Sequence, residues 1–171
     1  IGLILIIVEP YRIKRVTDWF TSIQGGEAGY QTQQGLYAIG SGGIFGKGLG
    51  KSMQKLGFVP EPHNDMIFSI VCEELGLFGA ICIIILFLML IIRIYRIAIS
   101  AKDLSGGLIT VGVMAHVAVQ VLVNIAVVTN TMPNTGVPLP FISSGGTSLL
   151  FLLGEIGLVL SVGRQRKQQE G

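Results

Sequence analysis

The run LGLFGAICIIILFLMLII, residues 75–92, decides the fold class, because it contains no charged side chain over its whole length. A helix needs about 20 consecutive apolar residues to cross the hydrocarbon core of a bilayer. The whole chain of 171 residues is 50% hydrophobic and 13% charged, with a mean hydropathy of +0.69. Soluble domains carry about 25% charged residues, and disordered chains have low hydrophobicity. The sequence therefore predicts an all-α, polytopic membrane helical bundle.

Further apolar and polar segments extend this pattern in both directions. We expect one membrane domain, 1–171, divided into the end of a helix at 1–8, a large outer loop at 9–65, membrane-spanning helices at 66–92, 104–128 and 145–163, and a tail at 164–171. A structureless loop as long as 9–65 would be unusual, so we expect short amphipathic or re-entrant helices within it. The short first segment predicts a fragment of a larger protein that is inactive alone.

Several other classes of protein and site are disfavoured. The net charge of +2 gives no argument for nucleic-acid binding. Cys72 and Cys82 are ten residues apart in one apolar run. That spacing is about 15 Å along a helix, whereas a disulfide needs Cα atoms within about 7 Å. The sequence has no nucleotide-binding glycine fingerprint and no metal-ligand spacing of His and Cys. No cofactor is predicted with certainty, and a divalent cation is left as an alternative.

The orientation follows from lysine and arginine in the short connections. The connection 93–103 and the tail 164–171 are both basic, and we place both in the cytoplasm. The connection 129–144 has no Lys or Arg, so we place it outside together with 9–65. The loop 9–65 is basic too, but long loops cross the membrane largely regardless of charge.

The cluster that most clearly indicates chemistry is PEPHND, residues 60–65, which places two carboxylates and a histidine immediately before a membrane helix. On the outer face, Asp65 could accept a proton from a sugar hydroxyl of a lipid-anchored substrate. It could equally cap the start of the helix. Glu61 and His63 lie close enough in sequence to share a substrate-binding role.

Three lysines are also spaced four residues apart: Lys47, Lys51 and Lys55. On a helix they would form one basic edge, and the neighbouring glycines would let backbone amides approach an anion. Contact with a diphosphate or phospholipid is one interpretation. Snorkelling of the lysines to ordinary lipid headgroups is the other.

Polar residues within the apolar segments have two interpretations as well. His116, Gln120 and Asn124 form one stripe on a helix, which favours hydrogen bonds between helices or a groove for a lipid-linked substrate. Glu155 lies deep in the last segment, where a carboxylate needs a partner or a proton. The pair Glu73–Glu74 either reaches the headgroups and caps a helix or lines a cavity.

Several motifs together resemble those of the SEDS family, whose branches are FtsW, RodA and SpoVE. They are PEPHNDMIF (60–68), EELG (73–76), PLPFISSGGTS (138–148), GYQ (29–31) and GKGLG (46–50). The resemblance covers nearly the whole chain. Within the first motif, Pro62 and Asn64 favour the FtsW/SpoVE branch.

The resemblance implies a ten-helix fold, of which this chain would be roughly the last four helices. It implies a peptidoglycan glycosyltransferase that polymerises lipid II at the outer face of the bacterial cytoplasmic membrane, in cell division or a related cell-shape process. Asp65 would be the catalytic residue that deprotonates the acceptor hydroxyl. The candidate substrate-binding residues are Glu61, His63, Ser143, Gly145 and Gly146, together with Lys47, Lys51 and Lys55. The contact of the lysines with the diphosphate is our inference from their charge and is not implied by the resemblance.

The resemblance also implies partners. A class B penicillin-binding protein would dock its transmembrane helix against residues 66–128, and other division proteins would join the complex. Two alternatives of a different class stay open: a lipid II flippase and a non-enzymatic scaffold of the division machinery.

Overall fold

The computed structural model describes residues 10–24, 30–52 and 65–167, and every regular element among them is a helix. In chain order these are α2 (Pro10–Ile23), α3 (Tyr30–Gly42), α4 (Ile67–Ile99), α5 (Leu104–Val128) and α6 (Gly146–Lys167). Three of them are long and apolar enough to cross a membrane, α4, α5 and residues Gly146–Gln165 of α6. The predicted fold class, a polytopic helical membrane protein, is confirmed. The predicted helix end at 1–8 lies outside the described residues.

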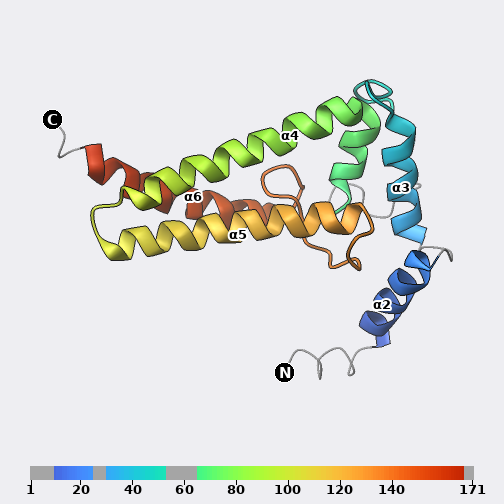
Figure 1. Cartoon of the computed structure of the whole chain (residues 1–171), viewed down its shortest axis with the longest axis horizontal. Coiled ribbons are helices and arrows are strands. Elements are labelled where there is room, and N and C mark those ends of the chain that lie inside the picture. The colour runs from blue at the N-terminus through green and yellow to red at the C-terminus, as the bar shows by residue number, and fades with distance from the viewer. Residues whose placement is uncertain (1–9, 25–29, 53–64, 168–171) are drawn as a thin grey trace.

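The three long helices run alongside one another, and α2 and α3 lie at the end of this bundle where α5 terminates (Figure 1). The connection between α4 and α5 lies at the opposite end, close to the end of α6 (Figure 1). The buried core joins all three long helices with the start of α4 and the α5–α6 connection. Its largest fully buried apolar side chains are Met66, Ile94, Leu139, Leu152, Val117, Val128 and Val159.

Helix α4 is longer than the predicted span 66–92 and ends at Ile99. Arg93 and Arg96 therefore lie on its last turns, where positive charge suits the carbonyl end of the helix dipole. Asp103 caps the next helix, because its side chain accepts a hydrogen bond from the Gly106 amide at 2.9 Å. The connection between the two helices is consequently only four residues long, 100–103.

A sharp bend divides α4 at Gly76, which has φ 68° and ψ −165° (Figure 1). In a continuous helix the carbonyls of Glu73 and Glu74 would accept hydrogen bonds from amides four residues later. Here they accept from the amides of Lys47 and Gly48, both at 2.9 Å. The connection after α3 therefore supplies the donors that the bend removes.

The exchange is reciprocal. The amides of Leu77 and Phe78, which begin the second limb of α4, donate to the carbonyls of Gly43 and Ile44 at 2.9 and 3.2 Å. The two backbones approach so closely that a Cβ atom added at Gly46 would overlap the carbonyl of Glu74. The second limb, 77–99, is about 34 Å long at 1.5 Å per residue and can span a bilayer without the first.

The connection between α5 and α6 turns back along α5 instead of staying at its end (Figure 1). Gln120 Nε2 donates to the carbonyl of Pro138 at 3.1 Å, although Gln120 lies two helical turns before the end of α5. Leu139 and Pro140 of this re-entrant connection are buried. Irregular backbone at membrane depth is tolerated only where protein groups satisfy its polar atoms, which is what Gln120 does.

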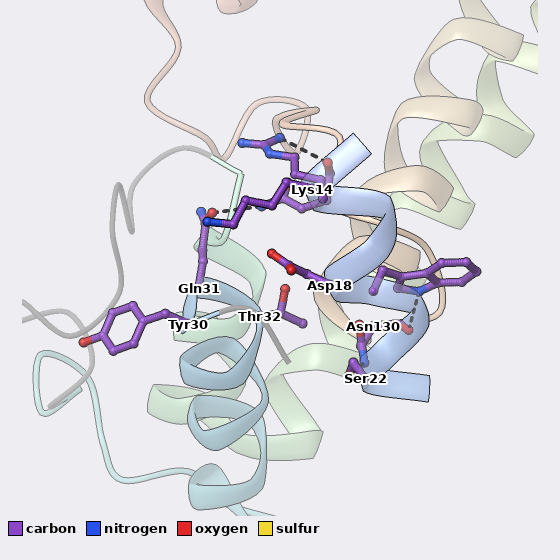
Figure 2. Close-up of a pocket in the computed structure, with 10 residues that line it drawn as sticks. Lys14, Asp18, Ser22, Tyr30, Gln31, Thr32 and Asn130 are labelled. Atoms are coloured by element: carbon purple, nitrogen blue, oxygen red, sulfur yellow. Dashed lines mark hydrogen bonds between the residues drawn. The ribbon is translucent and has the colours of Figure 1, made fainter. Parts of the chain in front are cut away.

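Helix α2 is amphipathic in the sense expected for a helix at a membrane surface. Its apolar side chains Ile13, Val16, Phe20 and Ile23 follow helical spacing and are all exposed. The opposite, polar face turns toward α3 and the re-entrant connection (Figure 2). An apolar stripe that points outward suits lipid better than water.

Candidate functional site

Asp65 lies in the turn directly before α4 and is 7% exposed. The N-cap position of α4 is occupied by Met66, so Asp65 lies one residue before the position that the capping hypothesis gave it. The backbone carbonyl of Asp65 accepts a hydrogen bond from Asn124 Nδ2 at 2.8 Å. The start of α4 is thus tied to α5.

Asn124 joins three parts of the structure. Its completely buried Nδ2 group donates to Asp65 and also to the carbonyl of Val137 in the re-entrant connection, again at 2.8 Å. Together with Gln120 it satisfies two consecutive carbonyls of that connection. These two members of the predicted polar stripe hold irregular backbone in place, a role that helical periodicity alone could not distinguish from contact with another helix.

His116, the third member of the stripe, makes the interhelical contact that was predicted. Its Nδ1 atom lies 2.9 Å from Oε2 of Glu155 on α6. His116 is 52% exposed and Glu155 is 29% exposed, so the pair lies at the edge of the described bundle. Glu155 therefore has the partner that its depth in the last segment requires.

The second predicted motif forms a turn followed by a helix start. The Ser143 hydroxyl accepts a hydrogen bond from the Leu139 amide at 2.8 Å, and the Ser143 amide returns one to the Leu139 carbonyl at 3.1 Å. Gly145 accepts from the amide of Leu149 at 2.9 Å, and Gly146 is the first residue of α6. Ser143 and Gly145 are half-buried, and Gly146 is exposed.

The predicted lysine edge is wrong in its geometry, because Lys47 and Lys51 lie in the irregular connection after α3 and not on a helix. The glycine-rich sequence there follows the bend of α4 instead of continuing α3. The Lys47 Nζ atom lies 2.7 Å from Oε1 of Glu73, whereas Lys51 is exposed. Lys55, together with Glu61 and His63, lies outside the described residues.

Glu73 is completely buried and has several partners. Besides Lys47, the hydroxyl of Ser52 donates to it at 2.5 Å and that of Ser41 at 3.4 Å. The headgroup and capping interpretations of Glu73 are therefore wrong. The sequence signal that could have indicated this is the position of Glu73 three residues before a glycine, but nothing in the sequence identifies residues 41, 47 and 52 as its partners.

A separate polar cavity of about 250 Å³ lies between α2, α3 and the first part of the re-entrant connection (Figure 2). One side of it is held by Asn134, whose carbonyl accepts from Arg15 Nη1 at 3.1 Å and whose Nδ2 donates to Gln31 Oε1 at 2.9 Å. None of the predicted site residues lines this cavity.

The other side is held by Asn130, which adopts a positive φ of 60°. Its carbonyl accepts from Trp19 Nε1 at 3.1 Å, and its Nδ2 group donates to the Ser22 hydroxyl at 2.7 Å. The sequence pattern did not predict this cavity. The apolar spacing of α2 could have placed Asp18 and Ser22 on its polar face, but not opposite α3.

Within the described ranges, no group of three His, Cys, Asp or Glu side chains could hold a metal ion. Asp65 is a buried carboxylate beside the re-entrant connection, a position from which it could exchange a proton with a bound hydroxyl.

The sequence is similar to one family model and to several curated proteins. The model of the FtsW, RodA and SpoVE family, described as cell cycle proteins, matches residues 1–168. Stage V sporulation protein E of Bacillus subtilis (strain 168) is 47% identical over 161 residues, which are 94% of this chain and 44% of that protein. A protein named "Probable peptidoglycan glycosyltransferase FtsW" from Trichlorobacter lovleyi is 42% identical over 159 residues, covering 92% of this chain and 42% of that protein.

Two solved structures are also similar. One, described under "Structural coordination of polymerization and crosslinking by a peptidoglycan synthase complex", has a TM-score of 0.69 at 29% identity and covers 94% of this chain and 44% of that chain. A mutant of the rod shape determining protein RodA from Thermus thermophilus has a TM-score of 0.60 at 36% identity, covering 77% and 40%. The chain thus spans less than half the length of these relatives, and it belongs to the FtsW, RodA and SpoVE family of membrane proteins.

Proposed function

We propose that the protein polymerises lipid II into glycan strands at the outer face of the bacterial cytoplasmic membrane, as a peptidoglycan glycosyltransferase. The observation that carries this proposal is the position of Asp65. It is a buried carboxylate at the start of α4, and Asn124 ties its backbone to the re-entrant connection. The names of the relatives that are 40–43% identical support a role in cell-wall synthesis.

In the proposed reaction, the Asp65 carboxylate accepts the proton of a hydroxyl on the acceptor sugar. The hydroxyl oxygen forms a bond to the anomeric carbon of the donor sugar, while the bond from that carbon to the diphosphate breaks. The polyprenyl diphosphate leaves with the bonding electron pair. A buried base works with little competition from bulk water, and general-base catalysis contributes about 10²- to 10⁴-fold.

The orientation of the chain supports the same assignment. Asp65 is at the start of α4, near the bundle end that carries α2 and α3 (Figure 1). The other end carries the basic segment 93–103, which includes the last turns of α4 and the connection to α5. Basic connections favour the cytoplasmic side. We therefore infer that Asp65, 9–65 and 129–144 lie outside, and that 93–103 and 164–171 lie in the cytoplasm.

A class B penicillin-binding protein is the proposed partner, with its transmembrane helix against residues 66–128. The solved relative that belongs to a peptidoglycan synthase complex supports this pairing. Large apolar side chains on α4 and α5, among them Leu86 and Leu108, are exposed and available to a further helix.

The experiment is polymerisation of lipid II by the full-length protein with its partner in vesicles, comparing wild type with Asp65→Asn. Asn preserves the shape of the side chain but cannot take the proton, so we expect a loss of about 10²- to 10⁴-fold with partner binding intact. Glu61→Gln and His63→Ala are the comparison variants. Near-normal polymerisation by Asp65→Asn would contradict the assignment, and movement of lipid II across vesicles without polymerisation would favour a flippase.

A further inference from the structure

The polar cavity between α2 and α3 is lined by side chains whose polar groups could bind a ligand. Lys14 and Asp18 extend from α2 toward α3, where Thr32 and Gln31 face them (Figure 2). Within residues 10–24, 30–52 and 65–167, Lys14, Asp18 and Thr32 make no hydrogen bond or ion pair with one another or with other side chains. Asp18 and Thr32 are half-buried, so their polar groups face the cavity at a cost in solvation.

Hydrogen bonds join the walls of the cavity, which favours binding without a large loss of conformational entropy. Asn134 joins Arg15 of α2 to Gln31 of α3. Asn130 joins two further residues of α2 to the same connection. The three available side chains therefore project from two helices whose separation is set by hydrogen bonds.

The charges of the cavity select the chemistry of the ligand. Lys14, Arg15 and Asp18 are the charged side chains that line the cavity. Arg15 donates to the Asn134 carbonyl at 3.1 Å, and the other two carry opposite charges. An anion attracted by Lys14 would also meet the carboxylate of Asp18, and a cation attracted by Asp18 would meet Lys14. An apolar ligand would leave both charges without hydrogen bonds, which is costly. A neutral ligand rich in hydroxyl groups suits both residues, because each hydroxyl can donate to Asp18 and accept from Lys14 or Thr32.

The size of the cavity narrows the ligand further. Its volume of about 250 Å³ lies just below the range of about 300–1,000 Å³ that is usual for drug-sized ligands. A single sugar ring is a hydroxyl-rich group of suitable size. The ring of Tyr30 points away from the cavity (Figure 2), so it does not fill the space that a sugar of a longer chain would need.

We propose that this cavity binds one sugar unit of the growing glycan strand, at a place separate from Asp65. This assignment rests on the proposed polymerase function, because that function supplies a polysaccharide on the same side of the membrane. The cavity would then retain the strand between successive additions. Its loss would shorten the product more than it slows the first addition.

The first test measures saccharide binding directly, with chitotetraose as the probe and saturation-transfer NMR on the full-length protein in complex with its partner. We expect Asp18→Ala to weaken binding by about 10- to 150-fold and Thr32→Val by about 2- to 12-fold, the effects of losing a charged and a neutral hydrogen bond. Thr21→Val is the matched control, because Thr21 is exposed on α2 and its hydroxyl bonds to Thr17 of the same helix. Unchanged binding by Asp18→Ala would overturn the proposal.

The second test separates this site from the polymerase proposal. Asp65→Asn should retain the part of chitotetraose binding that Asp18→Ala removes, while losing polymerisation. Asp18→Ala should release shorter strands than wild type. Strands of normal length from folded Asp18→Ala protein would overturn the strand-binding site and leave the role of Asp65 unaffected. Persistent polymerisation by Asp65→Asn would contradict the polymerase mechanism, while the chitotetraose titration would still show whether the cavity binds a saccharide.

Loss of partner binding by Asp18→Ala with full saccharide binding would identify the cavity as a protein interface and overturn our proposal.

Discussion

The Nζ atom of Lys47 lies 2.7 Å from Oε1 of Glu73, which is completely buried beside the bend of α4. The backbones of the same two residues are also in contact, because the Lys47 amide donates to the Glu73 carbonyl at 2.9 Å. Lys47 thus contacts α4 through both its main chain and its side chain. This relationship fixes the glycine-rich connection after α3 against the helix that begins beside Asp65.

Removing the lysine should destabilise the bend. In Lys47→Met the buried carboxylate keeps its two serine donors but loses its cation, and we expect a cost of about 1.5–3 kcal/mol. The cost should fall at the lower end, because the Lys47 side chain is 35% exposed and partly screened by solvent. The measurement is the apparent melting temperature of the full-length protein in detergent.

The matched control is Lys51→Met, since Lys51 is exposed in the same connection and should have little effect on stability. The double variant Lys47→Met with Glu73→Gln should recover part of the loss, because it removes both charges together. Equal melting temperatures for Lys47→Met and Lys51→Met would show that the ion pair does not stabilise the bend.

Gly76→Ala should be severely destabilising. A φ of 68° with a ψ of −165° is open essentially only to glycine, and such strain costs about 1–3 kcal/mol for other residues. The added methyl group would also overlap the backbone of Gly46 and Ile44. Gly112→Ala on α5 is the control: it meets nothing within 4 Å and should be neutral or stabilising by up to about 1 kcal/mol. Comparable melting temperatures for the two variants would contradict the prediction that the bend requires glycine at position 76.

Asn124→Asp should impair polymerisation without touching the proposed base. The new carboxylate would face the carbonyl oxygens of Asp65 and Val137, which now accept hydrogen bonds from Nδ2. Losing both bonds should cost about 1–3 kcal/mol and displace the start of α4 from the re-entrant connection. Lipid II turnover per folded molecule is the measurement, and Leu122→Ala, at an exposed position of the same helix, is the control. Full activity in Asn124→Asp would show that the hydrogen bonds of Asn124 are not needed to position Asp65 for polymerisation.

Lys51→Ala tests the remaining lysine hypothesis. If Lys51 contacts the diphosphate, polymerisation should fall by about 10- to 150-fold, the loss of one charged hydrogen bond. Lys102→Ala, at an exposed position in the connection beyond α4, should have no such effect. Small and equal effects of the two changes would favour contact with ordinary lipid headgroups.

Cysteine labelling tests the orientation. In full-length protein whose native cysteines have been replaced, Thr135→Cys should react with a membrane-impermeant reagent added outside intact cells. Lys102→Cys should react only after the membrane is opened, because its basic connection is expected in the cytoplasm. Both positions are exposed, so access through the protein is not limiting. The reverse pattern would place Asp65 on the wrong side for the proposed reaction.

The sequence alone determined the fold class and the three segments that are long and apolar enough to cross a membrane. A long apolar run in a membrane can form all its backbone hydrogen bonds within itself only as an α-helix. The runs around residues 75–92 and 104–128 were therefore predictable as helices. The stripe on α5 was also predictable, because side chains four residues apart lie on one face of a helix. The family motifs indicated Asp65 as the candidate catalytic residue.

Only the tertiary structure decided how the irregular segments meet. The bend at Gly76 exists because the connection after α3 returns hydrogen bonds to both limbs of α4, and Lys47 pairs with Glu73 for the same reason. Asn124 likewise bonds to loop carbonyls that no periodicity predicts. Helical periodicity is a property of consecutive residues, whereas these contacts join residues 13–59 positions apart. Their partners follow from where the backbone leaves polar atoms unsatisfied, which becomes known only when the helices are packed.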